Sequence, residues 1–267
     1  MTESLRALCK RSLALVSVAR GFRFGVQHYR TEKLSVKRSR QRTAAIQSYF
    51  RGHKVRKLQI GTQEHTLPGW LNSDLRPIDE RIMFLDAREP FPFEDRTFDY
   101  IFSEHCIEHI TYSEGLSALR ECYRVLKPGG CVRIATPNLS VIIGLCSSPR
   151  NEMQERYLKW YVDTYTPEFG SHAPCFVVNN SFRLWGHQFI YDPETLASTM
   201  RTAGFTEVRW FAPGESDDEN LRGIEGHGKR AGDDMNCFET MIAEAKRAQD
   251  LDPSVVTKGS ERAAPLP

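Results

Sequence analysis

Two histidines and two glutamates fall within the nine residues FSEHCIEHI (102–110). Imidazole nitrogens and carboxylate oxygens hold divalent metals or move protons in proteins. His105, Glu108 and His109 are spaced i, i+3 and i+4, so in a helix they would project from one face. The stretch therefore predicts a metal site or an acid–base site. The alternative is a polar helix start, in which the helix dipole favours Glu108.

The order H-x-x-E-H is also that of a class of zinc proteases, in which the motif lies within a helix. Here the strand-like run TFDYIF (97–102) comes directly before it, which places His105 where a strand meets a helix. This context argues against a protease, while the question of a metal stays open.

The elements that must position this stretch alternate strands with helices or loops. We predict strands at 56–61, 69–75, 81–87, 97–105, 131–137, 206–213 and 237–245. Helices are predicted over 107–126, stopped by KPGG (127–130), and over 192–205, capped by Asp192. This alternation predicts an α/β domain with a mostly parallel sheet. Ligands of such sheets bind at the carboxyl ends of the strands.

A glycine and two acids stand at successive strand ends. Gly61 lets the backbone turn sharply and approach a ligand closely. Asp74 ends the next strand, where a carboxylate can accept both hydroxyls of a ribose. Asp86 ends the third strand, where it can accept from an adenine amino group. The set favours a cofactor that carries a nucleoside.

The segments LQIG (58–61), GWLNSDL (69–75), FLDAREPFPFEDRTFDYIFSEHCIEHI (84–110) and ECYRVLKPGGCVRIATPNL (121–139) together resemble class I S-adenosylmethionine (SAM)-dependent methyltransferases, of a bacterial type 11-like group. The resemblance implies a Rossmann-like, seven-stranded, mostly parallel sheet with helices on both faces. It implies SAM held by Gly61, Asp74 at the ribose, Asp86 and Ala87 at the adenine, and Ser103 beneath the sulfonium. The family usually has G-x-G where this chain has Gly61-Thr62-Gln63, which narrows the room for the cofactor.

Two metal-dependent O-methyltransferase families, of ubiquinone biosynthesis and of small-RNA 3′-terminal 2′-O-methylation, have E-x-x-E-H where this chain has residues 105–109. The RNA family adds a histidine in a phrase similar to GHQFIYDPETL (186–196), matched here by His187. The resemblance implies a divalent site of His105, Glu108, His109 and His187, in which nitrogen ligands favour Zn, Mn or Fe over Mg. Without a metal, His105 or His187 would be the general base.

These features predict O-methylation of a hydroxyl on a small molecule or glycan, because a hydroxyl needs activation and an amine usually does not. Two alternatives stay open. One is a non-catalytic SAM-fold scaffold or regulator, which the substituted glycine loop favours. The other is an RNA 2′-O-methyltransferase, which a basic arm favours. Nucleic acid is the less favoured partner, since no aromatic–basic pattern of a known RNA module occurs.

The net charge of +2 conceals a basic arm, because residues 1–57 hold 15 Lys and Arg but only two acids. We expect residues 1–54 to form a basic, partly helical arm that is solvated or contacts an anionic surface such as membrane lipid. Residues 55–247 would form the methyltransferase domain, with 171–192 a substrate lid or a packed insertion. The acidic loop 215–228 would lie near the same cleft, with His227 a less favoured ligand.

Residues 248–267 are expected to form a flexible tail. The seven cysteines are odd in number and contain no C-x-x-C, which indicates a reduced, cytoplasmic protein. No run approaches the roughly 20 apolar residues that a membrane span needs.

Overall fold

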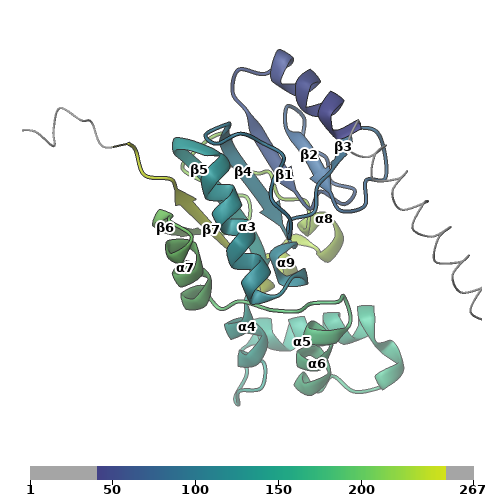
Figure 1. Cartoon of the computed structure of the whole chain (residues 1–267). Helices are drawn as coiled ribbons and strands as arrows, with labels where there is room; N and C mark the ends of the chain where they lie inside the picture. The colour runs from purple at the N-terminus through teal and green to yellow at the C-terminus, as the bar shows by residue number, and fades with distance from the viewer. Residues whose placement is uncertain (1–40, 251–267) are drawn as a thin grey trace, which may run out of the picture. The chain divides into compact units, whose positions relative to one another are not determined.

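The computed structural model describes residues 41–250 (Figure 1). The chain divides after Gly52, and a helix spans 41–52 of the first unit. Most of the predicted arm (1–40) and tail (251–267) lies outside the described residues. Within 41–250, every helix is too short or too polar to cross a bilayer.

The second unit is built around a seven-stranded sheet in the order β3-β2-β1-β4-β5-β7-β6. The parallel strands are β1 (Lys57–Ile60), β2 (Leu71–Asp74), β3 (Ile82–Phe84), β4 (Phe98–Glu104) and β5 (Leu126–Pro137). The last strand, β7 (Thr240–Lys246), pairs antiparallel with both β5 and β6 (Thr206–Phe211). The predicted seven-stranded, mostly parallel sheet is confirmed.

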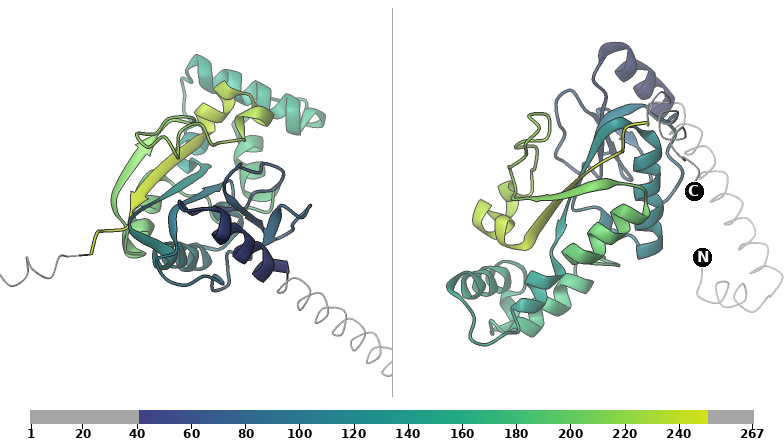
Figure 2. Two further views of the ribbon diagram at one scale, coloured as in Figure 1. Left: turned by 90° about the horizontal axis from the view of Figure 1, so that it is seen from above. Right: turned by 90° about the vertical axis from the view of Figure 1, so that its left-hand side faces the viewer.

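The two faces of the sheet are covered differently. The helices α3 (Tyr112–Val125) and α7 (Pro193–Thr202) pack on one face. The connections 61–70, 75–81 and 85–97 contain no helix. In the right-hand view of Figure 2, α3 lies on one side of the sheet and the loop 212–227 on the other. Leu67, Trp70 and Leu221 of the loops 61–70 and 212–227 pack there on sheet residues such as Phe102. This second face is therefore covered mainly by loops.

A buried arginine fastens the loop 212–227 to the sheet. Arg133 of β5 is fully buried, and its Nε and Nη1 donate to Glu225 Oε1 and Glu244 Oε1, each at 2.5 Å. Because Glu225 belongs to the loop and Glu244 to β7, the guanidinium holds three segments together.

The helix predicted over 107–126 begins later than expected. Residues Ile107–His109 form a separate 3₁₀ turn (η1), and α3 begins at Tyr112. Thr111 is the N-cap, since its Oγ1 accepts from Glu114 N while its own N donates to Glu114 Oε2. This T-x-x-E capping box sets the helix start. The helix ends at Val125, and β5 begins at Leu126 instead of 131.

A helical insertion follows β5 at the carboxyl end of the parallel strands (Figure 1). It consists of α4 (Leu139–Gly144), α5 (Glu152–Tyr165), η2 (Pro167–Phe169) and α6 (Pro174–Arg183). The insertion has its own core, which includes Tyr157, Tyr161 and Val177. Phe238 of α9 (Asp233–Glu239) packs against this core, so the insertion is seated on the element that leads into β7. The short α8 (Gly228–Ala231) precedes α9.

Candidate functional site

The carboxyl ends of β1, β2 and β3 meet at one edge of the sheet. The N–H groups of Gly61 and Thr62 donate to Ser73 O at 2.9 and 3.0 Å, and Leu85 N donates to Asp74 O at 3.0 Å. Gly61, Asp74 and Asp86 are therefore brought to neighbouring strand ends, where the cofactor is expected.

The loop after β1 keeps a glycine-like backbone although its second glycine is replaced. Gly61 has φ 76°, and a Cβ there would lie 2.7 Å from Cys106 Cβ and 2.8 Å from its Sγ. Gln63, at the position of the usual second glycine, has φ 49°. Its N–H donates to Asp74 Oδ2 at 2.8 Å, which helps to hold this unfavourable conformation. The substitution therefore changes the side chain at the loop but preserves its turn.

This edge also offers polar atoms that a ligand can satisfy. Thr62 is 2 % exposed, and its Oγ1 has no hydrogen-bond partner among residues 41–250. The same holds for Gln59 Oε1 on the adjoining strand. Buried polar atoms are nearly always paired, so these two atoms fit a site that a polar cofactor completes.

The other residues predicted for the cofactor lie close by. Asp86 is held by Arg88, whose Nε and Nη2 donate to its carboxylate at 2.9 and 2.7 Å. These hydrogen bonds lower the pKa of Asp86 and keep it charged. Ala87 follows it and is partly buried, while Ser103 is buried near the end of β4. Their contacts with SAM remain predictions.

Three of the four predicted metal ligands come together. Glu108, His109 and His187 each offer one ligand atom, and these atoms lie within 4.8 Å of one another. The segment after α6 is tied to η1, because Gln188 N and Phe189 N both donate to Glu108 O. His187 Nδ1 lies 2.5 Å from Ser181 O, a carbonyl that can only accept. His187 Nδ1 therefore carries the proton and leaves the Nε2 lone pair available.

His105 does not join this set. Its Nδ1 lies 3.1 Å from Glu108 Oε1, and its Nε2 lies 3.2 Å from Thr240 Oγ1. The Thr240 hydroxyl donates its own proton to Asn236 Oδ1, so it accepts from His105. A carboxylate also only accepts, and therefore both ring nitrogens of His105 donate. An imidazole in this state has no lone pair for a metal or for a substrate proton.

The electrostatics agree with a charged pair. Burial alone would lower the pKa of His105, but the hydrogen bond and charge of Glu108 outweigh it and leave this pKa raised. Burial likewise opposes ionisation of Glu108, yet His105 holds the pKa of that carboxyl below its usual value. The Thr136 hydroxyl donates to the second oxygen of Glu108 at 3.0 Å. His105 thus orients Glu108, which corrects its prediction as a ligand and as a base.

The backbone conformation explains why His105 does not join the other predicted ligands. The i, i+3, i+4 argument required a helix from residue 105, but His105 has φ 45° and precedes the 3₁₀ turn. His105 consequently contacts Glu108 but is not part of the group of ligand atoms that Glu108, His109 and His187 form.

His227, which the sequence indicated only as a less favoured ligand, forms a second histidine pair with His105. The ring of His227 stacks on that of His105, with centroids 3.9 Å apart. His227 Nε2 lies 3.0 Å from Glu239 Oε1, and the Tyr157 hydroxyl donates to Glu239 Oε2. The sequence did offer a sign of this contact, because Glu239 is the one charged residue in the mainly apolar run CFETMIA (237–243). Tyr157 gave none.

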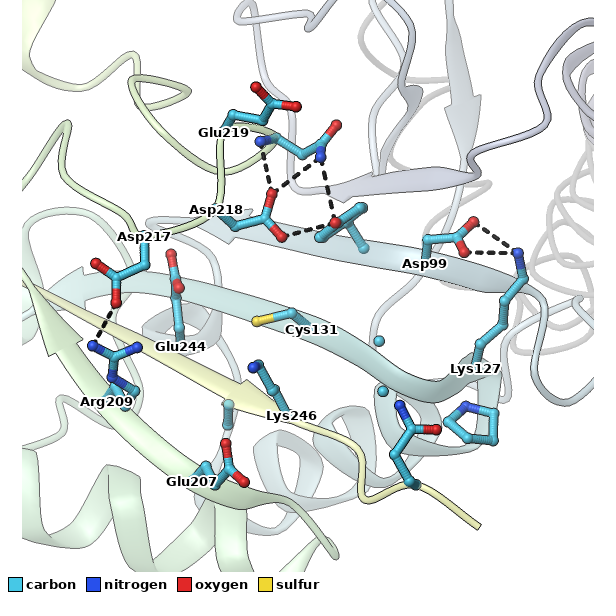
Figure 3. A pocket seen from close by; sticks show the side chains of 17 residues that line it. Asp99, Lys127, Cys131, Glu207, Arg209, Asp217, Asp218, Glu219, Glu244 and Lys246 are labelled. Carbon is cyan, nitrogen blue, oxygen red and sulfur yellow. Dashed lines mark hydrogen bonds and ion pairs between the residues drawn. The ribbon is translucent and has the colours of Figure 1, made fainter.

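A cavity of about 660 Å³ lies elsewhere, near the amino ends of β4 and β5 (Figure 3). Two of its cations are already paired, Lys127 with Asp99 at 2.8 Å and Arg209 with Asp217 at 2.5 Å. None of the predicted site residues lines this cavity, so it is separate from the cluster at the carboxyl ends.

Comparison with known proteins agrees with this architecture. Residues 72–134 match the family model described as a methyltransferase domain. Over 44 residues the chain is 50% identical to phosphoethanolamine N-methyltransferase 2 of Caenorhabditis elegans. The matched segment covers 16% of this chain and 10% of that protein. Over 128 residues it is 32% identical to the ubiquinone/menaquinone biosynthesis C-methyltransferase UbiE of Citrobacter koseri, covering 46% and 45%. The chain thus spans less than half of these relatives.

Among solved structures, a SAM dependent methyltransferase from Archaeoglobus fulgidus is similar at 18% identity and a TM-score of 0.43, covering 79% of this chain and 93% of that one. The strand order, together with the match over residues 72–134, is that of a class I SAM-dependent methyltransferase domain. SAM is the cofactor of this class of enzyme. The resemblance drawn from the sequence is confirmed at this level.

Proposed function

We propose that this protein transfers the methyl group of SAM to a hydroxyl of a small molecule or glycan. The cluster of Glu108, His109 and His187 carries the proposal, since it offers lone pairs at one point beside the end of β4. A hydroxyl attacks a methyl group effectively only when its proton is drawn away. The relatives are named as small-molecule N- and C-methyltransferases, which supports a small acceptor but not the choice of oxygen.

The donor set fits a divalent ion. One carboxylate and two imidazoles are typical ligands of Zn, Mn and Fe, and three protein ligands leave positions for an acceptor oxygen. An ion bound there would lower the pKa of an acceptor hydroxyl. The chain's own residues hold the ligands in place, because His105 and Thr136 fix Glu108 while Ser181 fixes the tautomer of His187.

The metal part of the proposal is tested by metal content. Protein purified without chelator should hold about one equivalent of Zn, Mn or Fe, and His187→Gln should lose most of it. His172→Gln is the matched control, since His172 pairs with Asp163 on the surface. A wild-type chain that holds no metal, and takes up none of these ions in calorimetry, would end the metal proposal.

The acceptor is tested with a defined panel. Catechol and a methyl hexoside offer hydroxyls, phosphoethanolamine offers an amine, and a reduced naphthoquinone offers a ring carbon. Each is incubated with SAM, and the product is located by mass spectrometry and NMR. We expect methyl ethers from a hydroxyl acceptor. Methylation only at nitrogen or carbon would contradict the proposal, and absence of SAM binding in calorimetry at millimolar concentration would favour the scaffold alternative.

A further inference from the structure

Methyl transfer to a hydroxyl also needs a group that accepts the hydroxyl proton. The histidines at the carboxyl end of the sheet differ in how well they can act as this base. His105 donates from both ring nitrogens and has no lone pair to offer. His109 and His187 each place a ring nitrogen within 4.8 Å of a carboxylate oxygen of Glu108, in the group proposed to hold the metal. His227 also lies in this region, with its backbone N–H hydrogen-bonded to Glu104 at the end of β4.

The hydrogen bonds of His227 define its tautomer. Its Nε2 lies 3.0 Å from Glu239 Oε1, and a carboxylate can only accept, so Nε2 carries the proton. No donor or acceptor among residues 41–250 pairs with its Nδ1, which keeps its lone pair. The side chain is 25% exposed, so a bound molecule can reach the ring.

The surroundings of Glu239 keep it ionised, so that it can stabilise a positive charge on the His227 ring. Burial opposes its ionisation, but the hydrogen bond from His227 and the charge of His105 hold the pKa of Glu239 below its ordinary value. Tyr157 of the helical insertion donates to the second oxygen of Glu239. A buried carboxylate held by two donors orients an imidazole and stabilises its protonated form.

The backbone places His227 between the cofactor loop and the end of β4. Gly226 has no room for a side chain, because a Cβ would lie 2.5 Å from the ring of His65. His65 follows the Gly61 loop, and its Nε2 lies 3.0 Å from Ile224 O. On the other side, Glu104 accepts from the N–H groups of Gly226 and His227. These contacts bring His227 next to the strand end where the sulfonium is expected.

We infer that His227, positioned by Glu239 and Tyr157, takes the proton of the acceptor during methyl transfer. As the acceptor oxygen bonds to the methyl carbon, the carbon–sulfur bond breaks and its electron pair stays on sulfur. The hydroxyl proton passes to His227 Nδ1 and then to solvent. The products are the methyl ether, S-adenosylhomocysteine and one proton. The inference rests on the proposed function and supplies its base.

The first test needs no acceptor. Long-range proton–nitrogen correlation NMR of the full chain should show that neutral His227 carries its proton on Nε2, and that His105 is protonated at both nitrogens. The charged groups facing His227 are His105, Glu239 and Glu104, so spectra of Glu239→Gln identify the signals of the pair. A neutral His227 that carries its proton on Nδ1 in place of Nε2 would overturn the inference, whatever the enzyme methylates.

The second test measures the reaction itself with whichever panel compound the wild type methylates. His227→Gln should lower kcat by roughly 10²- to 10⁴-fold, the usual worth of a general base, and abolish the acid limb of the pH–rate profile. Glu239→Gln should lower kcat less and displace that limb. His172→Gln should change neither. An unchanged pH profile in His227→Gln would refute the role.

Calorimetry with S-adenosylhomocysteine on the same variants separates the causes of a loss. Binding retained in His227→Gln within about threefold, with kcat lost, supports the base role. Loss of binding together with kcat would show that His227 only maintains the cofactor site. A wild type that binds no S-adenosylhomocysteine would refute the proposed function, while the NMR result would still report on the histidine pair.

Discussion

Replacing Gly61 with alanine should destabilise the protein in two ways that can be measured separately. Gly61 has φ 76°, where a residue with a Cβ costs about 1–2 kcal/mol. The new Cβ would also lie 2.7 Å from Cys106 Cβ, and such overpacking typically costs about 1–3 kcal/mol. The expected total is about 2–5 kcal/mol in the free energy of unfolding.

Gly69 provides the matched control within the same connection. It has φ 77°, but a Cβ there would meet nothing within 4 Å. Gly69→Ala should therefore cost only the backbone part, about 1–2 kcal/mol. Urea unfolding of both variants gives the difference, which isolates the contact with Cys106. Equal destabilisation would refute the close approach of the cofactor loop to Cys106. Gly61→Ala should in addition weaken SAM binding in calorimetry.

Three further predictions concern single side chains. Gln63→Gly removes the strain of a φ of 49° but raises the conformational entropy of the unfolded chain, so the free energy of unfolding should change by less than about 1 kcal/mol. SAM binding should tighten, because the smaller residue leaves more room for the cofactor. Weaker SAM binding would contradict this prediction. The pKa of Glu108 is depressed, so its contribution to stability is present above about pH 4.3 and is lost as pH falls through the folded value. Glu108→Gln should flatten the acid fall of the urea midpoint, and an unchanged fall would count against the charged pair. Arg133→Met leaves two carboxylates without their buried partner and should cost about 3–5 kcal/mol in the free energy of unfolding. The control Arg81→Met removes an exposed ion pair with Asp79 and should leave the urea midpoint nearly unchanged.

The strand ends of the fold could be read from the sequence because local patterns determine them. Gly61, Asp74 and Asp86 each follow a short apolar run, and parallel strands bring such positions to one edge. The pairing of His187 with Glu108 and His109 was also predicted, although only through a resemblance. A local sequence pattern alone cannot show that His187 lies close to Glu108 and His109, because these residues are far apart along the chain.

The role of His105 could not be predicted from its spacing, because the helix start was misplaced. The pair Thr111 and Glu114 forms a capping box, and this signal competes with the apolar periodicity that suggested a helix from 107. Once the helix begins at Tyr112, residues 105–109 no longer follow helical geometry. The network of His227, Glu239 and Tyr157 depends wholly on tertiary contacts between a loop, α9 and the insertion.

The position of β7 constrains how the domain can be assembled during synthesis. It is the last strand of the sheet, yet it lies between β5 and β6 and pairs with both. Until residue 246 has left the ribosome, β6 has no partner strand and β5 presents an open edge that other chains can bind. A chain that still lacks β7 therefore exposes the edges of two strands, and the addition of this one strand pairs both of them.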